Sequence, residues 1–191
     1  MLAQTLVFLI NTIGDLFAFA LITRFILQWV RAPARNQLSE FVAALTNFIV
    51  MPTRRFVPGL WGLDLATLLL ALVTETLKLW LLLELNGARL GTMATLTPLA
   101  FIALAGIHIA QLMIYLVIGA LILQAILSWV NPYSPIAPVL NSVTRPFLQP
   151  FQRVLPLIAN VDLSPLAALL VCQLLLAVPL AWLEANIGRL L

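Results

Sequence analysis

The sequence has few of the residues on which catalysis and cofactor binding usually depend. Its 191 residues include one cysteine, Cys172, and one histidine, His108. A single cysteine excludes an intrachain disulfide and a cysteine-based metal site. A single histidine excludes a metal or haem site with two histidines from one chain. Charged residues make up only 9% of the chain, against about 25% in soluble domains. The small net charge of +3 does not suggest nucleic-acid binding.

Hydrophobic residues take the place of the missing charges. They make up 63% of the chain, and the mean hydropathy is +1.09. Soluble domains are about 45–50% apolar, so this composition predicts an integral membrane protein. Residues 1–10 contain no Lys or Arg, which is unlike a signal or transit peptide. We therefore expect the first apolar segment to be retained as a span.

Four stretches reach the roughly 20 mostly apolar residues that a spanning helix needs. The third is too long for one upright span, so either it tilts or residues 92–105 form a separate interfacial or re-entrant piece, with Pro98 and Gly106 as possible breaks. The sequence therefore predicts an all-α membrane protein with four transmembrane helices. The stretches are residues 2–29, 63–83, 96–130 and 166–187.

Arginine gathers in the two long loops, which sets the expected orientation. Short cytoplasmic loops carry an excess of Lys and Arg, so we expect both long loops in the cytoplasm and both termini on the outer side of the membrane. Trp29 and Trp129 end their spans on the loop side, where indole rings favour the headgroup layer. The loop arginines are Arg31, Arg35, Arg54, Arg55, Arg145 and Arg153, against Arg89 and Arg189 on the other side.

One pattern occurs twice, 98 residues apart, and the two tryptophans are 100 residues apart. Such self-similarity predicts a duplicated unit, here residues 1–90 and 91–191. Both copies point the same way, which indicates a parallel repeat and disfavours an inverted-repeat transporter. The matching pairs are Leu38 and Ile136, Phe41 and Val139, Val42 and Leu140, Leu45 and Val143, Thr46 and Thr144, Ile49 and Phe147, Pro52 and Pro150, Arg55 and Arg153, Pro58 and Pro156, and Asp64 and Asp162.

Each unit contains an amphipathic segment between its spans, which we expect to lie as a helix in the membrane interface. Pro52 and Pro150 should stop these helices. A structural collar is the preferred interpretation and a lipid or partner dock is the alternative. Asp64 and Asp162 are interpreted as caps of the following helices. The first apolar stripe is Leu38, Phe41, Val42, Leu45, Phe48 and Ile49, with Ser39, Glu40, Thr46 and Asn47 off it. The basic residues expected to meet anionic headgroups are Arg54, Arg55, Arg145 and Arg153.

Each amphipathic segment leads into a hinge that reads Pro-x-x-Arg, two hydrophobic residues and Pro, followed by an Asp. The hinges are Pro52-Thr53-Arg54-Arg55-Phe56-Val57-Pro58 and Pro150-Phe151-Gln152-Arg153-Val154-Leu155-Pro156. With the preceding Trp-Val span end, this motif resembles the YggT family, also called YlmG, of small membrane proteins in bacteria and plastids. The likeness covers nearly the whole chain and departs at Gln152, where the family often has a basic residue. It implies a link to osmotic tolerance, division or assembly of membrane complexes, with no enzymatic activity and no cofactor.

Ionisable groups within the spans are candidates for a functional site. Counted from the loop-side tryptophans at about 1.5 Å per residue, five polar side chains lie at similar depth in the outer half of three spans. They could bind a cation or relay protons, but a structural ion pair between Glu75 and Lys78 is preferred. Asp15 then needs a partner, for which Lys78 is the candidate. The cluster is Asp15, Glu75, Lys78, Gln111 and Tyr115.

Small residues predict close helix packing. Gly14 and Ala18 lie one turn apart in the first span, and the fourth span carries an alanine ridge that is either an internal interface or an oligomer face. Pro179 should kink this span. The ridge is Ala177, Ala181 and Ala185, in register with Gln173.

No Gly-rich phosphate loop, nucleophile motif or metal-ligand cluster occurs in the sequence, so an enzyme is disfavoured. The preferred function is a scaffold or assembly factor whose partners are the bilayer with its anionic headgroups and membrane proteins, or further copies of the chain. The alternative is an oligomeric channel or permease for ions or osmolytes.

Overall fold

The computed structural model describes residues 2–33, 36–59, 62–90, 98–131, 133–154 and 162–189. These residues form helices and connecting turns, with no strand among them. The hinge residues 155–161, Pro156 included, lie outside the described part, as do Arg35 and residues 92–97. The helices are α1 (Leu2–Trp29), α2 (Gln37–Thr53), α3 (Leu65–Leu90), α4 (Pro98–Val130), α5 (Ala137–Val154), α6 (Ser164–Leu175), the π-helical turn η1 (Leu176–Leu180) and α7 (Ala181–Arg189).

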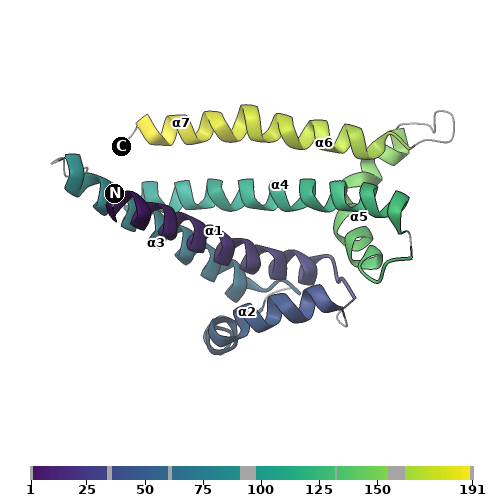
Figure 1. Cartoon of the computed structure of the whole chain (residues 1–191), viewed down its shortest axis with the longest axis horizontal. Helices are drawn as coiled ribbons and strands as arrows, with labels where there is room; N and C mark the ends of the chain where they lie inside the picture. Colours follow the sequence, from purple (N-terminus) through teal and green to yellow (C-terminus); the bar gives the residue numbers. More distant parts are fainter. Residues whose placement is uncertain are drawn as a thin grey trace.

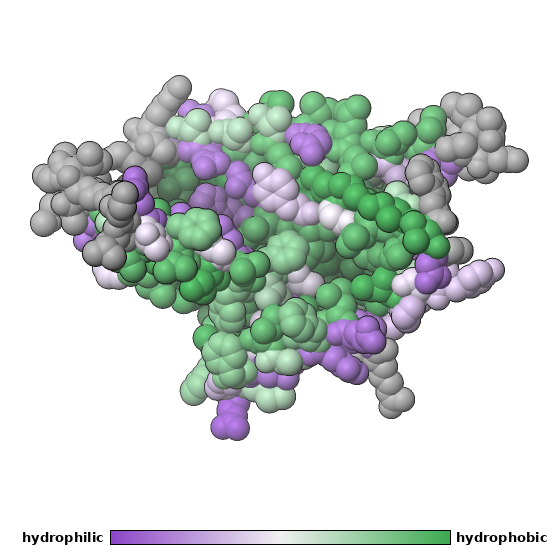
Figure 2. All heavy atoms as spheres, viewed as in Figure 1, coloured by the Kyte–Doolittle hydropathy of each residue, from purple (hydrophilic) through white to green (hydrophobic). Residues whose placement is uncertain are grey.

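Four helical runs are long and apolar enough to cross a membrane, which confirms the predicted spans. They are α1, α3, α4 and the continuous run from α6 to α7. Figure 1 shows α1 and α4 running in one direction and α3 and α6–α7 returning, with α2 and α5 gathered at the same end. The two halves are therefore parallel. Hydrophobic residues cover most of the visible face in Figure 2, as lipid-facing helices require.

The third span is one uninterrupted helix from Pro98. The predicted break at Gly106 is wrong, because a glycine keeps its backbone N–H and a helix in lipid gains from satisfying every such group internally. Pro98 begins the helix, where a missing N–H has no cost. At about 1.5 Å per residue, the 33 residues of α4 exceed a hydrocarbon core of about 30 Å. Tilting or protrusion at one end therefore accommodates the length.

The prolines of the amphipathic helices act differently in the two halves. α2 ends at Thr53, one residue after Pro52, as predicted. α5 instead continues through Pro146 and Pro150 to Val154, so the predicted stop at Pro150 is wrong. Both prolines of α5 are exposed, and carbonyls that lose an N–H partner on an exposed face remain open to water.

The buried face of α2 differs from the predicted stripe. Thr46 is fully buried between Val42 and Val50, whereas Phe41 and Phe48 are exposed. Thr46 was expected off the stripe, but its hydroxyl donates to the Val42 carbonyl at 2.7 Å and so is satisfied inside the fold. The exposed aromatic side chains leave an apolar face for the acyl boundary. α5 buries Val139, Leu140, Val143, Thr144 and Leu148.

The core lies where α1, α3, α4 and α5 meet, and α6 adds a smaller cluster with α4 and α5. α6 packs through Ser164, Ala168 and Cys172, which are buried one turn apart. The predicted ridge is exposed within the chain, so it is not an internal interface. Pro179 lies within the π-helical turn η1, which joins α6 to α7. The predicted kink at this proline stays a prediction. The exposed ridge residues are Ala177, Ala181 and Ala185.

Candidate functional site: a polar network across four spans

Lys78 and Glu75 form the buried centre of the polar cluster. Glu75 is 0% exposed and Lys78 is 7% exposed, although both lie within the apolar helix α3. The Lys78 ammonium is 2.6 Å from Glu75 Oε2 and also donates to Asp15 Oδ1 on α1. The predicted pairing of Asp15 with Lys78 is thus confirmed. One cation between two carboxylates lowers the cost of all three charges at membrane depth.

Gly14 allows α1 to come close to this centre. A Cβ atom at Gly14 would lie 2.9 Å from Lys78 Cδ and 3.2 Å from Lys78 Cγ, both shorter than ordinary van der Waals contact. The Lys78 stem therefore lies across a gap that only glycine leaves open. One turn further on, Ala18 is fully buried, which confirms the packing role predicted for these two small residues.

His108 on α4 extends the network to the fourth span. Its Nδ1 is 3.3 Å from Glu75 Oε2, and its Nε2 is 3.8 Å from Glu184 Oε1 on α7. Gln111, one turn after His108, donates its amide to Glu184 Oε2 at 3.0 Å. Polar groups from α1, α3, α4 and α7 are thereby joined across the bundle.

The sequence reasoning missed His108 and Glu184. His108 is three residues before Gln111, so their shared helix face was a usable signal. Glu184 had no comparable signal, because the face it occupies depends on how η1 turns α7 relative to α6. An extra residue in one helical turn rotates everything after it.

A pocket of about 300 Å³ opens beside the network. Four of the five predicted cluster residues line it, and the fifth, Glu75, lies in the bonded centre and is fully buried. Among the described residues, Glu75 Oε1 has no hydrogen-bond partner. The repeat supplies two matched pairs to the lining, since Asn11 and Gln111, and Asp15 and Tyr115, are 100 residues apart. The polar lining is Asn11, Asp15, Lys78, His108, Gln111 and Tyr115.

The charges of the network favour a proton or a small cation. Three carboxylates, of Asp15, Glu75 and Glu184, face one lysine and one histidine. No group of three or more His, Cys, Asp or Glu in the described part is arranged to hold a metal ion. The network joins the spans laterally, and an apolar core separates it from the loop end. That core includes Leu21, Ile22, Ile26, Leu70, Leu116 and Leu121.

A second set of polar contacts fixes the hinge after α2. Arg54 pairs with Asp64 and donates to Gln28 Oε1 at 3.0 Å. Asp64 accepts the Thr67 amide at 3.3 Å, which confirms it as the cap of α3. Burial alone would raise the pKa of Asp64, but hydrogen bonds from Arg54 and Thr67 and the charge of Arg54 hold that pKa below its ordinary value.

The second repeat makes the equivalent contacts with neutral side chains. Gln152, which replaces Arg54, donates to Asp162 Oδ2 at 3.0 Å. Asp162 accepts the Ser164 amide at 2.8 Å, so it bonds the first turn of α6, although Leu163 is the residue at the N-cap position. Likewise, Thr46 accepts from Arg24 at 2.7 Å in the first repeat, and Thr144 donates to Gln124 in the second.

The other three arginines that were predicted to meet headgroups are exposed, as that role requires: Arg55, Arg145 and Arg153. Their contact with anionic headgroups stays a prediction.

Comparisons with known proteins place this architecture in a family. The family model described as CCB3/YggT matches residues 3–85 and 103–183, one block in each half. The chain is 36% identical over 171 residues to an uncharacterised protein of Pseudomonas aeruginosa, covering 88% of this chain and 85% of the relative. It is 34% identical over 169 residues to the uncharacterised protein YggT of Escherichia coli K12, covering 87% and 85%. No solved structure matches. The chain therefore belongs to the CCB3/YggT family of two-repeat proteins.

Proposed function

We propose that this protein is a non-enzymatic scaffold or assembly factor of the bacterial inner membrane, with its long loops in the cytoplasm. The observation that carries the proposal is the loop end, where α2 and α5 lie at the same end of the spans. This end presents exposed Phe41 and Phe48 together with exposed Arg55 and Arg153. Apolar and basic side chains together suit a membrane surface and acidic partners.

The polar network supports the same assignment. It ties α1, α3, α4 and α7 together at one level, while apolar side chains fill the described core between that level and the loops. This apolar layer disfavours a polar route through a single copy. The exposed alanine ridge of the fourth span suits a membrane-protein partner or a second copy. The physiological setting that we propose is osmotic stress tolerance or cell division.

The experiment is site-specific photocrosslinking from Tyr133, which is 94% exposed at the loop end, in cells before and after an osmotic upshift. We expect crosslinks to proteins of division or membrane-complex assembly, lost when Arg55, Arg145 and Arg153 are replaced by Gln. The matched control is Arg89→Gln, at the far end of α3. Equal crosslinking by the triple variant would contradict a role for the basic loop end.

A second candidate, an oligomeric channel or permease, is favoured by the pocket beside Lys78 and by the unpaired Glu75 Oε1. Its test is ion and osmolyte flux into liposomes under an osmotic gradient. Flux above that of empty vesicles, abolished by Asp15→Asn or Glu75→Gln in folded protein, would replace the scaffold proposal. An absence of flux from folded, oriented protein would leave the loop end as the working surface.

A further inference from the structure

Three arginines from different segments of the first repeat line one pocket of about 400 Å³ at the loop end. Arg24 comes from the last turns of α1, Arg31 from the turn after α1, and Arg54 from the turn after α2. The volume is within the range of small-molecule sites. Gln28 and Ser39 add an amide and a hydroxyl, and the apolar lining is Leu27, Ala32, Val42 and Ala43.

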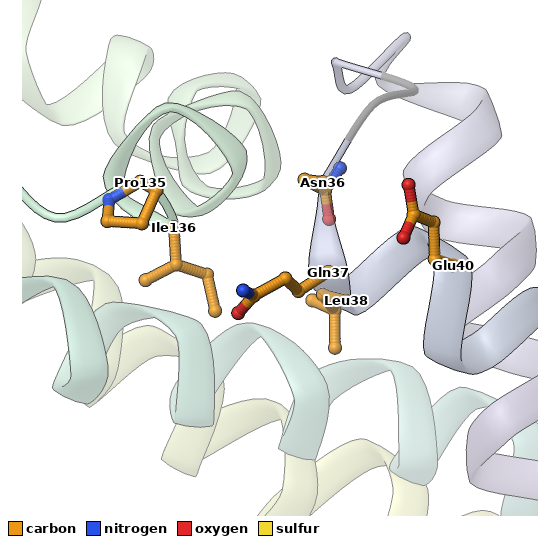
Figure 3. A pocket seen from close by; sticks show the side chains of 6 residues that line it. All are labelled: Asn36, Gln37, Leu38, Glu40, Pro135 and Ile136. Atoms are coloured by element: carbon orange, nitrogen blue, oxygen red, sulfur yellow. The ribbon is translucent and has the colours of Figure 1, made fainter.

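The positive charge of this pocket is only partly balanced. Asp64 pairs with Arg54, but Arg24 donates through Nη1 to two neutral groups, Thr46 Oγ1 at 2.7 Å and Asn47 Oδ1 at 2.8 Å. Among the described residues, no acidic side chain bonds Arg24 or Arg31. Glu40, the acidic residue of α2, instead lines a neighbouring pocket with Asn36, Gln37, Leu38, Pro135 and Ile136 (Figure 3).

Arg31 occupies a backbone conformation that favours glycine. Its φ is 52°, in the left-handed region. The Ala32 amide donates to the Leu27 carbonyl at 2.9 Å and the Arg31 amide to the Gln28 carbonyl at 3.1 Å, which closes the end of α1. Glycine is the usual residue at such a helix end. An arginine here costs backbone energy, and no described residue accepts a hydrogen bond from its side chain, which leaves its guanidinium group available to a ligand.

The second repeat provides an internal comparison for all three arginines. Gln124, Asn131 and Gln152 stand at the positions of Arg24, Arg31 and Arg54. Gln124 still bonds the equivalent threonine, Thr144, and Gln152 still bonds the equivalent aspartate. Neutral amides are thus sufficient for these contacts. A positive charge at these three positions therefore occurs only in the first repeat.

We propose that this pocket binds the phosphate of an anionic phospholipid headgroup. Guanidinium groups match phosphate oxygens in bidentate geometry, and Arg24 retains Nε and Nη2 for that purpose. Inorganic phosphate shares this chemistry, but a lipid also uses the apolar lining and the exposed Phe41, Leu45 and Phe48 of the adjoining helix face. The site goes beyond the proposed scaffold function and is independent of any protein partner.

The test measures lipid retention by native mass spectrometry of the purified full chain, with phosphatidylglycerol or phosphatidylcholine supplied in equal amounts. Wild-type protein should retain phosphatidylglycerol preferentially. The variants Arg24→Gln, Arg31→Asn and Arg54→Gln copy the second repeat, and each should lower that preference about fivefold. Arg31→Asn is the sharpest of the three, because asparagine tolerates the left-handed conformation and the melting temperature should not fall.

Arg89→Gln, which removes one charge at the far end of α3, is the matched control and should keep the preference. Equal retention of the two lipids by wild-type protein, or an undiminished preference in the folded triple variant, would overturn the proposal. A parallel titration with inorganic phosphate separates the two sources of the anion. Phosphate binding that is lost in the triple variant, without any preference between the lipids, would show that the lipid assignment is wrong.

Discussion

Lys78 illustrates how a charge is held within an apolar helix. Its ammonium lies between Asp15 on another helix and Glu75 on its own, and the stem of the side chain fits over Gly14. An isolated charge at this depth is expensive, whereas a paired and hydrogen-bonded charge costs much less. The ion pair between α1 and α3 therefore contributes to the association of these two spans.

We expect the Asp15→Leu and Lys78→Leu substitutions to be strongly non-additive. Lys78→Leu leaves Asp15 and Glu75 without their shared cation, whereas Asp15→Leu leaves Lys78 paired with Glu75 alone. Asp15→Leu should therefore cost less when Lys78 is already replaced by Leu. The coupling free energy of contacting charged residues is roughly 0.5–3 kcal/mol. Melting curves of the four proteins of this cycle in detergent provide the measurement. Additive losses would mean that the pair carries no net interaction.

Asp64 should make stability depend on pH in the acid range. Its pKa in the folded state is lowered, so its contribution is complete above the unfolded-state pKa of about 3.9. That contribution is lost as pH falls through the folded-state pKa. Asp64→Asn keeps a capping side chain but removes the charge, and we expect a loss of about 1–2 kcal/mol at pH 7. Melting temperatures from pH 7 down to about pH 2 test this, because the loss is expected below the unfolded-state pKa.

Asp162→Asn is the control for that measurement, because Asp162 bonds the neutral Gln152 and is exposed. Its effect at pH 7 should be smaller than that of Asp64→Asn. An acid dependence that is unchanged in Asp64→Asn would show that another group controls it.

At the level of elements, η1 determines which face of the fourth span meets the polar network. α6 faces α4 and α5 through Ser164, Ala168 and Cys172, and α7 brings Glu184 to Gln111. Pro179 lies between these two contacts and lacks the N–H that a regular helix would use. The π-helical turn thus couples packing near the loops to the network near the termini.

Pro179→Ala should therefore release Glu184 from the network. Alanine restores the missing N–H, which favours a regular α-helix and rotates α7 by about 100° relative to α6. Cysteines at Gln111 and Glu184, in a Cys172→Ser background, should be joined by a short bifunctional thiol reagent when Pro179 is present. Much weaker crosslinking is expected when the Pro179→Ala substitution is added. Equal yields would mean that proline does not determine the rotation.

The element boundaries show which features a sequence determines by itself. Span positions followed from apolar length, because a helix must cover the hydrocarbon core whatever it packs against. The buried face of α2 was harder to predict, since Thr46 is polar and yet bonds its own helix and Arg24. Pro150 was misjudged because the cost of proline depends on whether the freed carbonyl is exposed. Each of these errors concerns tertiary surroundings that periodicity does not encode.

For the whole molecule, the repeat carried most of the predictable information. Equal spacing of two patterns predicted a duplication, and the arginine bias predicted that its halves are parallel. Counting depth from the tryptophans brought Asp15 and Lys78 together from different spans. Depth along a helix follows from residue number, but rotation about its axis depends on packing. For that reason Asp15 and Lys78 were paired correctly, whereas His108 and Glu184 were left out of the cluster.

Parallel halves also predict where chemical reagents reach the protein. Phe56 and Tyr133 are 85% and 94% exposed, one at the loop end of each repeat. We expect single cysteines at these positions, in a Cys172→Ser background, to react with a membrane-impermeant maleimide in inverted inner-membrane vesicles. Neither should react in right-side-out vesicles, because the arginine bias predicts both loops in the cytoplasm. Labelling of the two cysteines from opposite sides of the membrane would contradict the parallel arrangement. Labelling of both only in right-side-out vesicles would show that the orientation is the opposite of the predicted one, with the parallel fold retained.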